Sequence, residues 1–358
     1  KYANNNNSVR ETANIIKNME RDLNLFNDES YGRELRLAYE FSRVSLHNML
    51  KMHFSGHQIA HTPVEKYRKM SPLRLFRFIL DIAYNSFVKS WIWAPRKREY
   101  LVFCHPRLRF READGIYEDV YTDDLIDELG PERCTIIENP YHWKHEKPRP
   151  HKVWHNEMSQ LISIIIKQII KNRKKKKKKK LEKLSIDIAK YLKKFLGRDF
   201  KYEVSNKLNN SVIILTKSKI QYLLLLKYLK PKKILVLVSY GNEGLIWAAK
   251  ELRIPTIEIQ HGVITDEHLG YSFPNSMKKY TFPDYLLLFG NYWKQTVHFP
   301  IEKNRLISFG YPYLERLLDK YGNTEKRNQI IFISQGPIGD KLSKFAVEFA
   351  KSNTNDIH

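Results

Sequence analysis

The chain has 358 residues and a formal net charge of +23, with 62 Lys and Arg against 39 Asp and Glu. Its length allows about two domains, and a hydrophobic content of 42% excludes wholesale disorder. Only two cysteines occur, Cys104 and Cys134, which excludes a disulfide framework and favours a reducing cytoplasm. The positive charge predicts an anionic partner, such as nucleic acid, an acidic membrane surface, an acidic polymer or a phosphorylated substrate.

Residues 1–97 predict a helical N-terminal extension. In residues 31–51 apolar side chains recur at helical spacing, and residues 73–91 show the pattern more clearly. The apolar stripe of this second helix consists of Leu73, Phe76, Leu80, Ala83, Phe87 and Trp91. We prefer the interpretation that this stripe packs on the neighbouring domain, and the alternative is a basic amphipathic helix lying on an anionic membrane. Charges interrupt the apolar window, so it does not predict a bilayer-spanning helix.

From residue 98 the pattern becomes α/β. Residues 99–104 predict a strand that leads into a basic loop, 105–109. An acidic turn and a short helix follow, with Thr122 or Asp123 as its cap, and residues 134–137 predict the next strand. The first Rossmann-like domain is therefore expected to start near residue 98.

Residues 143–210 predict a basic helical insertion. It contains an apolar helix at 161–170, a nearly continuous basic run at 171–180 and a helix with one apolar face at 181–195. The lysine run is either a solvated tract, which we slightly prefer, or a segment attracted to anionic lipid headgroups.

A βαβ unit follows, with strands at 233–238 and 255–259 around a helix at 241–252. Its strands should be parallel, and ligands bind beyond the carboxyl ends of parallel strands. The residues that follow these two strands, and so share one edge, are Ser239, Tyr240, Gly241, Gln260, His261 and Gly262. The remaining predicted elements of this domain are helices at 211–229, 291–298 and 313–320 and strands at 284–289 and 305–309.

A polar linker at 323–328 precedes a predicted strand at 329–333 and a helix at 341–351. We interpret residues 326–358 as the first βα unit of a second Rossmann-like domain. One such unit cannot bury both faces of its strand, so we expect the working protein to be longer than this chain.

Three short motifs carry a family resemblance. Gln260-His-Gly262 with Tyr271-Ser-Phe-Pro274, and Phe309-Gly-Tyr-Pro312, resemble acceptor-domain motifs of GT-B-fold transferases of bacterial and archaeal surface polysaccharides. That group includes capsule-polysaccharide and polysialic-acid glycosyltransferases and, more distantly, CDP-glycerol glycerophosphotransferases. His105-Pro-Arg107 with the segment 117–123 is similar to a segment of the same surface-carbohydrate proteins.

The resemblance covers residues 98–340 and implies a GT-B-like fold. Residues 98–325 would form a Rossmann-like acceptor domain, and residues 326–358 would begin the nucleotide-sugar domain. The absence of a Gly-x-Gly-x-x-Gly fingerprint at either start fits a nucleotide-sugar transferase better than a dehydrogenase. Metal-independent transfer without a cofactor is also what the resemblance implies.

By resemblance, His261 is the candidate general base that deprotonates an acceptor hydroxyl. A histidine with a pKa near 6.5 is largely neutral at pH 7 and can accept that proton. The competing interpretation is that His261 only hydrogen-bonds its turn. Asp123 is the rival base, although capping a helix would occupy it equally well. Gly262 has no side chain to block a sugar.

The remaining candidate substrate-binding residues are cationic, polar or glycine residues near strand ends. The loop of His105, Arg107 and Arg109 could hold an anionic acceptor, because arginine donates two parallel hydrogen bonds to carboxylate or phosphate; solvated surface charge is equally compatible. The other candidate acceptor-binding residues are Tyr121, Glu243, Gln260, His268 and Tyr271. The candidate donor-binding residues are Gly310, Pro312, Ser334, Gln335 and Gly336, the last three preceding a helix whose N-terminus favours phosphate.

The preferred function is therefore a cytoplasmic glycosyltransferase, peripheral on the inner face of the cell membrane, acting on a surface polysaccharide or lipid-linked glycan. Transfer of a polyol phosphate from a CDP-linked donor is the alternative enzyme. A basic RNA-binding protein is the non-enzymatic alternative, but no RNA-recognition motif accompanies the charge, so we expect no nucleic acid partner. The histidines His142, His145, His151 and His155 lack zinc-site spacing, so no metal ligand cluster is expected.

Overall fold

The computed structural model describes residues 2–55, 71–171, 178–274, 277–325, 327–334 and 338–352. The chain divides into two compact units, Lys1–Pro312 and Tyr313–His358, and each is described by itself. Most of the predicted basic run at 171–180 lies outside the described residues.

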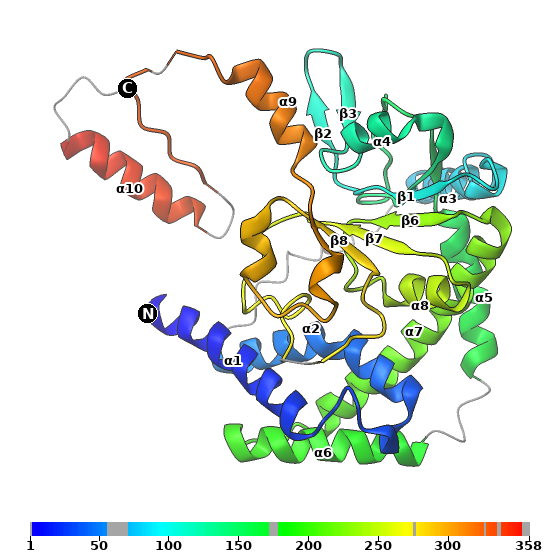
Figure 1. The fold of residues 1–358 in the computed structure, drawn as a ribbon, viewed down its shortest axis with the longest axis vertical. Coiled ribbons are helices and arrows are strands. Elements are labelled where there is room, and N and C mark those ends of the chain that lie inside the picture. The colour runs from blue at the N-terminus through cyan, green and yellow to red at the C-terminus, as the bar shows by residue number, and fades with distance from the viewer. Residues whose placement is uncertain are drawn as a thin grey trace. The chain divides into compact units, whose positions relative to one another are not determined.

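The first unit is built on a seven-stranded parallel sheet with the order β5-β4-β1-β6-β7-β8-β9 (Figure 1). The strands are β1 (Tyr100–Phe103), β4 (Cys134–Glu138), β5 (Val153–His155), β6 (Lys233–Val236), β7 (Thr256–Ile259), β8 (Tyr285–Leu288) and β9 (Leu306–Ser308). The chain adds β4 and β5 on one side of β1 and then returns to add β6 and its successors on the other. This is the winding of a Rossmann sheet, and it confirms the predicted α/β class.

Helices cover both faces of the sheet, because its central strands are apolar on both sides. On one face Leu101 and Val236 pack against Leu225 and Leu245, which belong to α7 (Lys201–Leu229) and α8 (Glu243–Glu251). On the other face Val102 packs with Ile126 of α4 (Asp123–Leu129). The alternation of side chains along β1 thus places a core on each face.

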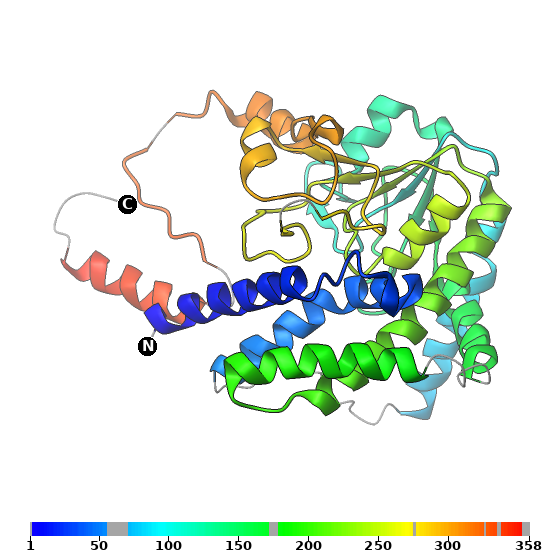
Figure 2. The same cartoon turned by 60° about the horizontal axis from the view of Figure 1, so that its bottom comes forward.

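The N-terminal helices belong to the same compact unit as the sheet. They are α1 (Tyr2–Asp22) and α2 (Arg33–Ser55), which pack with α6 (Lys178–Leu196) and α7 (Figure 2). Their shared core also receives Leu269 and Phe273 from the long connection between β7 and β8. The helical layer therefore supports a loop that follows a sheet strand.

Most predicted elements are confirmed, with differences where local structure is short or irregular. The sequence missed β5 and the hairpin of β2 (Arg109–Arg111) and β3 (Ile116–Glu118), since three-residue strands carry little periodicity. The helix before β6 starts at Lys201 rather than Ser211. The helix predicted at 291–298 is only a 3₁₀ turn, η5 (Asn291–Gln295), ahead of the β-branched pair Thr296 and Val297. The other elements are η1 (Glu29–Tyr31), α3 (Pro72–Phe87), η2 (Trp91–Trp93), η3 (Pro131–Arg133), α5 (Glu157–Lys171), η6 (Lys303–Arg305), α9 (Pro312–Tyr321) and α10 (Gly339–Ser352).

The predicted packing of the stripe on α3 is wrong. Its members Leu73, Phe76, Leu80 and Phe87 are exposed, and the helix ends at Phe87. Trp91 is buried, but it lies in η2. Periodicity identified the helix correctly and could not show which of its faces is covered.

In the second unit the predicted strand 329–333 is wrong. The described residues of this segment pair with no strand. A strand needs a neighbour for its N-H and C=O groups, and this segment instead packs Phe332 against Phe345 and Phe349 of α10, with ring centroids 6.2 and 6.1 Å away. Ile331 and Ile333 remain exposed.

Candidate active site

The direction of winding changes between β1 and β6, which are neighbours in the sheet. The connections after two such strands diverge and leave a crevice at their carboxyl ends, where ligands bind in open parallel sheets. His105 follows β1 and Tyr240 follows β6, while His261 follows the adjacent β7. The predicted functional edge therefore lies at the switch point of the sheet.

Asp119 organises the loop that carries His105. It is buried, and its carboxylate accepts hydrogen bonds from the His105 backbone N-H at 2.7 Å, the Tyr121 N-H at 3.0 Å and the Thr122 hydroxyl at 2.6 Å. Burial raises its pKa and these bonds act in the opposite direction. One carboxylate thus fixes both His105 and Tyr121 at the crevice.

His261 lies half-buried between two tyrosines. The Tyr240 hydroxyl is 3.3 Å from Nε2, and the Tyr271 hydroxyl is 3.3 Å from Nδ1. Its backbone carbonyl accepts a 2.8 Å hydrogen bond from the Tyr121 hydroxyl. Burial, together with the nearby His268 and His105, lowers the pKa of His261 to about 4. The imidazole is therefore neutral at pH 7 and has a nitrogen able to accept a proton.

Glu258 of β7 orients this imidazole through Tyr271. The Tyr271 hydroxyl donates to Glu258 Oε1 at 2.5 Å, and the Ser239 backbone N-H donates to the same oxygen at 3.0 Å. Because the tyrosine proton goes to Glu258, the Tyr271 oxygen is free to accept from Nδ1-H of His261, and we infer from this contact that Nε2 is the basic nitrogen. Burial raises the pKa of Glu258 to about 7. This role of Glu258 was not predicted from the sequence, where its signal is a carboxylate inside an apolar strand.

Aromatic rings from three loops line the crevice beside His261. Tyr121 stacks on Tyr311 with centroids 5.9 Å apart and an interplanar angle of 18°, and Tyr311 stacks on Phe289 at 4.7 Å. His105 meets the edge of Tyr121 at 5.7 Å. A stacked row of this kind offers flat apolar faces, as small-molecule sites commonly do.

His268 and Gly262 also lie where the sequence predicted. The His268 ring is 5.1 Å from Tyr240 and 4.9 Å from Tyr271, and burial lowers its pKa. A Cβ added at Gly262 would meet no atom within 4 Å, so the space around it is open. Five predicted residues, His105, Tyr121, His261, His268 and Tyr271, are thus brought together.

Gln260 and Glu243 turn inward instead of facing the crevice. Gln260 is buried, donates from Nε2 to the Gly262 carbonyl at 2.8 Å and accepts from the Phe289 N-H at 2.8 Å. Glu243 is buried, pairs with Lys279 at 2.9 Å and accepts from the Gly241 N-H at 2.6 Å. Their contacts hold loops in place, which corrects the expectation that they bind acceptor directly.

Asp123 is buried beneath the loop rather than exposed beside His261. It accepts from the Asp119 N-H at 2.7 Å and lies 3.4 Å from Arg149. Burial raises its pKa to about 7. Of the two predicted cap residues, Thr122 is the N-cap residue of α4; it makes no side-chain cap bond, because its hydroxyl donates to Asp119. These contacts give Asp123 a structural role.

The remaining residues that were predicted to bind acceptor or donor lie beside the His261 site, in the second unit or outside the described residues. Arg107 is exposed in the loop after β1, and Arg109 is exposed at the start of β2. Gly310 has a φ of +99°, which favours glycine there, and Pro312 begins α9. Ser334 belongs to the second unit, and Gln335 and Gly336 lie outside the described residues.

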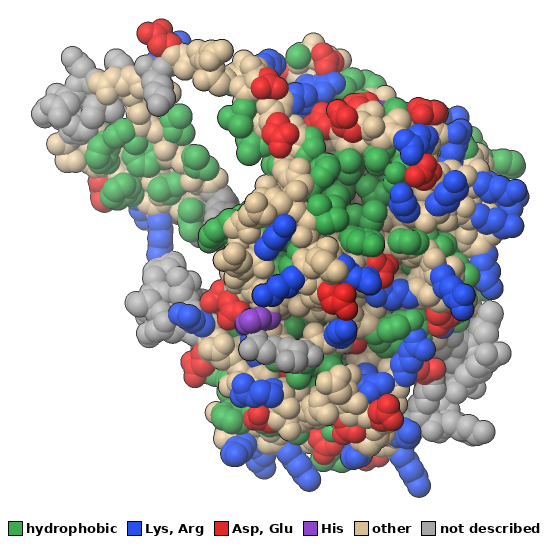
Figure 3. Space-filling view, viewed as in Figure 1, with side chains coloured by type: hydrophobic (Ala, Val, Ile, Leu, Met, Phe, Trp, Pro, Cys, Tyr) green, Lys and Arg blue, Asp and Glu red, His purple; other side chains and the backbone are tan. Residues whose placement is uncertain are grey.

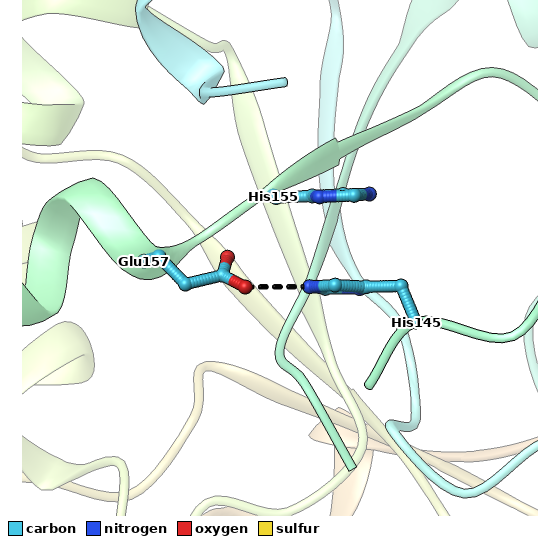
Figure 4. Close-up of side chains that lie close together, drawn as sticks. All are labelled: His145, His155 and Glu157. Carbon is cyan, nitrogen blue, oxygen red and sulfur yellow. Dashed lines mark hydrogen bonds and ion pairs between the residues drawn. The ribbon is translucent and has the colours of Figure 1, made fainter. Parts of the chain in front are cut away.

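A second buried polar cluster lies where β4 and β5 end (Figure 4). His145 Nδ1 donates to Glu138 at 2.6 Å and Nε2 to Glu157 at 2.8 Å. The His155 ring stacks on His145 with centroids 3.6 Å apart and an angle of 6°. Burial alone would lower the pKa of His145, but the two carboxylates outweigh it and raise the pKa to about 8. Burial and the charge of His145 lower the pKa of His155 to about 3.

His145, His155 and Glu157 each offer a possible metal-ligand atom within 4.8 Å of the others, although the sequence predicted no such cluster. Imidazole lone pairs lie in the ring plane, so two parallel rings do not direct them at one point. Binding a metal would require one ring to turn. In the present arrangement the carboxylates hold a protonated His145.

We expect this proton to make stability depend on pH. The folded pKa of His145 lies above its ordinary value of 6.5, so the stabilisation is complete below about pH 6.5 and is lost as pH rises through about 8. The loss should be about 2 kcal/mol in the free energy of unfolding. Urea titrations across this range should show a steeper decline for the native chain than for His145→Gln. Equal slopes would contradict the assignment, and exposed His298→Gln is the control.

Fold and site together define a class: a doubly wound parallel α/β protein with a cluster of tyrosine and histidine side chains at its switch point. Compared with known proteins, the chain matches no protein-family model and no curated protein sequence.

Proposed function

We propose that the chain is a glycosyltransferase of the GT-B type, which moves a sugar from a nucleotide-sugar donor to a surface polysaccharide or lipid-linked glycan. One observation carries the proposal: the three segments that resemble such transferases meet at one place. Tyr121 of the first segment donates to the His261 carbonyl of the second at 2.8 Å and stacks on Tyr311 of the third. Residues so distant in sequence share a crevice, as parts of one site do.

In this proposal His261 Nε2 removes the proton of the acceptor hydroxyl. The acceptor oxygen then bonds to the anomeric carbon, the bond from that carbon to the donor phosphate oxygen breaks, and the nucleotide leaves with the electron pair. Glu258, acting through Tyr271, holds the ring and stabilises the imidazolium that forms. A pKa of about 4 makes His261 a weak base in the free protein. The negative charge of a bound nucleotide sugar would raise that pKa toward the working range.

Two further features support donor and acceptor binding. Arg107 is exposed and close enough to Tyr121 for its charge to affect the pKa of that phenol, so it can attract an anionic substrate at the mouth of the crevice. We propose that the unit Tyr313–His358 contributes to binding of the nucleotide sugar, and that the exposed Ile331 and Ile333 of this unit are covered in that complex.

RNA binding has less support. Proteins that bind nucleic acid commonly gather Lys and Arg on one face or stripe. On the face shown in Figure 3, basic side chains are interspersed with acidic and hydrophobic ones.

The proposal is tested by incubating the chain with UDP-, GDP-, CMP- and CDP-linked sugars, and separately with CDP-glycerol, while nucleotide release and product are followed. Release that depends on a glycan acceptor supports glycosyl transfer, and release from CDP-glycerol alone would favour the polyol phosphotransferase. No release from any donor, combined with RNA binding that weakens steeply with salt, would replace both with a nucleic-acid function.

A further inference from the structure

The outer surface of α3 is the largest run of exposed apolar side chains on one helix among the described residues. Seven of them are each 45–61% exposed: Leu73, Leu75, Phe76, Ile79, Leu80, Tyr84 and Phe87. Val88, directly after the helix, is 55% exposed. Contiguous apolar surface of this kind on a folded protein marks a site of interaction with another protein, a ligand or a membrane.

This exposure is not the result of a loosely attached helix. Phe78 on the inner side meets the edge of Trp143 with centroids 5.4 Å apart. Asn85 shares a 2.9 Å hydrogen bond with His155, and the His155 N-H donates to the Lys89 carbonyl at 2.8 Å. The helix is tied to β5 on one side, and its apolar residues point outward on the other.

Neighbouring elements extend the apolar surface. α5 packs beside α3 (Figures 1 and 2) and exposes Ile164 and Ile165. Trp93 and Trp143 are also more than half exposed, and tryptophan is enriched where a protein meets the headgroup level of a bilayer. We call α3, these two isoleucines and these two tryptophans the α3–α5 surface.

The sequence of α3 and of the segments next to α3 and α5 is rich in Lys and Arg. Asp81 is the one acidic residue in the sequence of α3, against Arg74 and Arg77. The sequence shortly before α3 reads Lys66-Tyr-Arg-Lys69, and a basic run, 171–180, follows α5. Lys and Arg close to a bilayer are attracted to anionic headgroups, so both polarity and charge match an acidic lipid surface.

The lengths of the helices determine how they can meet a bilayer. α3 has 16 residues, about 24 Å at the usual rise, which is shorter than the hydrocarbon core of about 30 Å. No helix in the described part of the chain is long and apolar enough to cross a membrane. A short apolar helix with basic flanks lies in the plane of the interface instead.

We propose that the α3–α5 surface docks on the headgroup region of an anionic lipid bilayer. The proposal rests on exposed side chains remote from His261, so it stands or fails separately from glycosyl transfer: vesicle binding requires neither donor nor acceptor.

The test is flotation of the full chain with vesicles of phosphatidylcholine, and with vesicles of equal parts phosphatidylcholine and phosphatidylglycerol. We expect binding to the anionic vesicles. The double substitution Phe76→Ser and Leu80→Ser should lower the partition coefficient at least tenfold, because two apolar side chains no longer enter the interface. The matched control is Phe110→Ser, since Phe110 is 49% exposed on β2 and Phe76 is 58% exposed.

A second variant tests the proposal in case the double substitution lowers binding by unfolding the chain. Arg77→Glu leaves the apolar surface intact and should weaken binding to anionic vesicles while leaving any binding to neutral vesicles unchanged. Unchanged flotation of both variants, or no flotation of the native chain, overturns the proposal. It is also overturned if light scattering shows a dimer of the native chain that the double substitution abolishes, since the occupant would then be a second copy.

Discussion

We expect His261→Ala to lower kcat for sugar transfer by about 10²- to 10⁴-fold, the usual contribution of a positioned general base. KM for the donor should change little, because the substitution removes a proton acceptor and no contact that the donor needs for binding. Stopped or continuous nucleotide-release assays, with the donor that the incubation with nucleotide sugars selects, provide the measurement. The expected loss follows from a neutral ring whose Nε2 lies at the crevice and whose Nδ1 is held by Tyr271.

The matched control for that variant is His298→Ala, because His298 is an exposed histidine on the same unit. It should retain native turnover. If His261→Ala keeps turnover within about threefold of the native chain, a loss too small for a general base, His261 has no part in the proton transfer.

The second large effect is expected at Arg43, which is buried in the N-terminal helical layer. Its guanidinium donates to both oxygens of buried Glu20, one of them at 2.8 Å, and to the Leu269 carbonyl. It also lies 3.9 Å from the centre of the Phe273 ring. Arg43 therefore joins α1 and α2 to the loop that carries His268 and Tyr271.

Arg43→Met should lower the free energy of unfolding by about 3–5 kcal/mol, because Glu20 would be left buried without its cation. Urea denaturation measures the loss. Arg36→Met is the control on the same helix, since Arg36 makes one exposed hydrogen bond to the Asn27 carbonyl, and it should cost under about 1 kcal/mol. Adding Glu20→Met to Arg43→Met should recover part of the loss. A loss below about 1 kcal/mol for Arg43→Met would show that Arg43 does not stabilise the fold by neutralising Glu20.

The sheet was predictable because its strands are buried on both faces and so form continuous apolar runs, as in Ile234-Leu-Val236. The position of His261 followed from the same pattern, since a polar turn after a buried strand lies at the carboxyl edge. The contacts of each side chain were harder to predict from the sequence. Gln260 and His261 are neighbours in sequence, yet one is buried and the other lines the crevice.

The unpredicted parts depend on contacts between distant segments. Glu258 meets Tyr271 because an irregular loop folds back over the end of β7. His145 reaches Glu138 and Glu157 from a connection without regular structure. No periodicity encodes such contacts, and the same limit applies to α3, whose covered face is decided by its contacts with α5 and β5 rather than by its own sequence.

The most direct test of the account is an NMR titration of the His261 ring in the free protein, assigned by comparison with His261→Ala. We predict that the ring stays neutral at pH 6, carries its proton on Nδ1 and titrates near the pKa of about 4 that burial imposes. An ordinary histidine pKa near 6.5, with the ring mostly protonated at pH 6, would show that His261 is solvated and outside the proposed crevice.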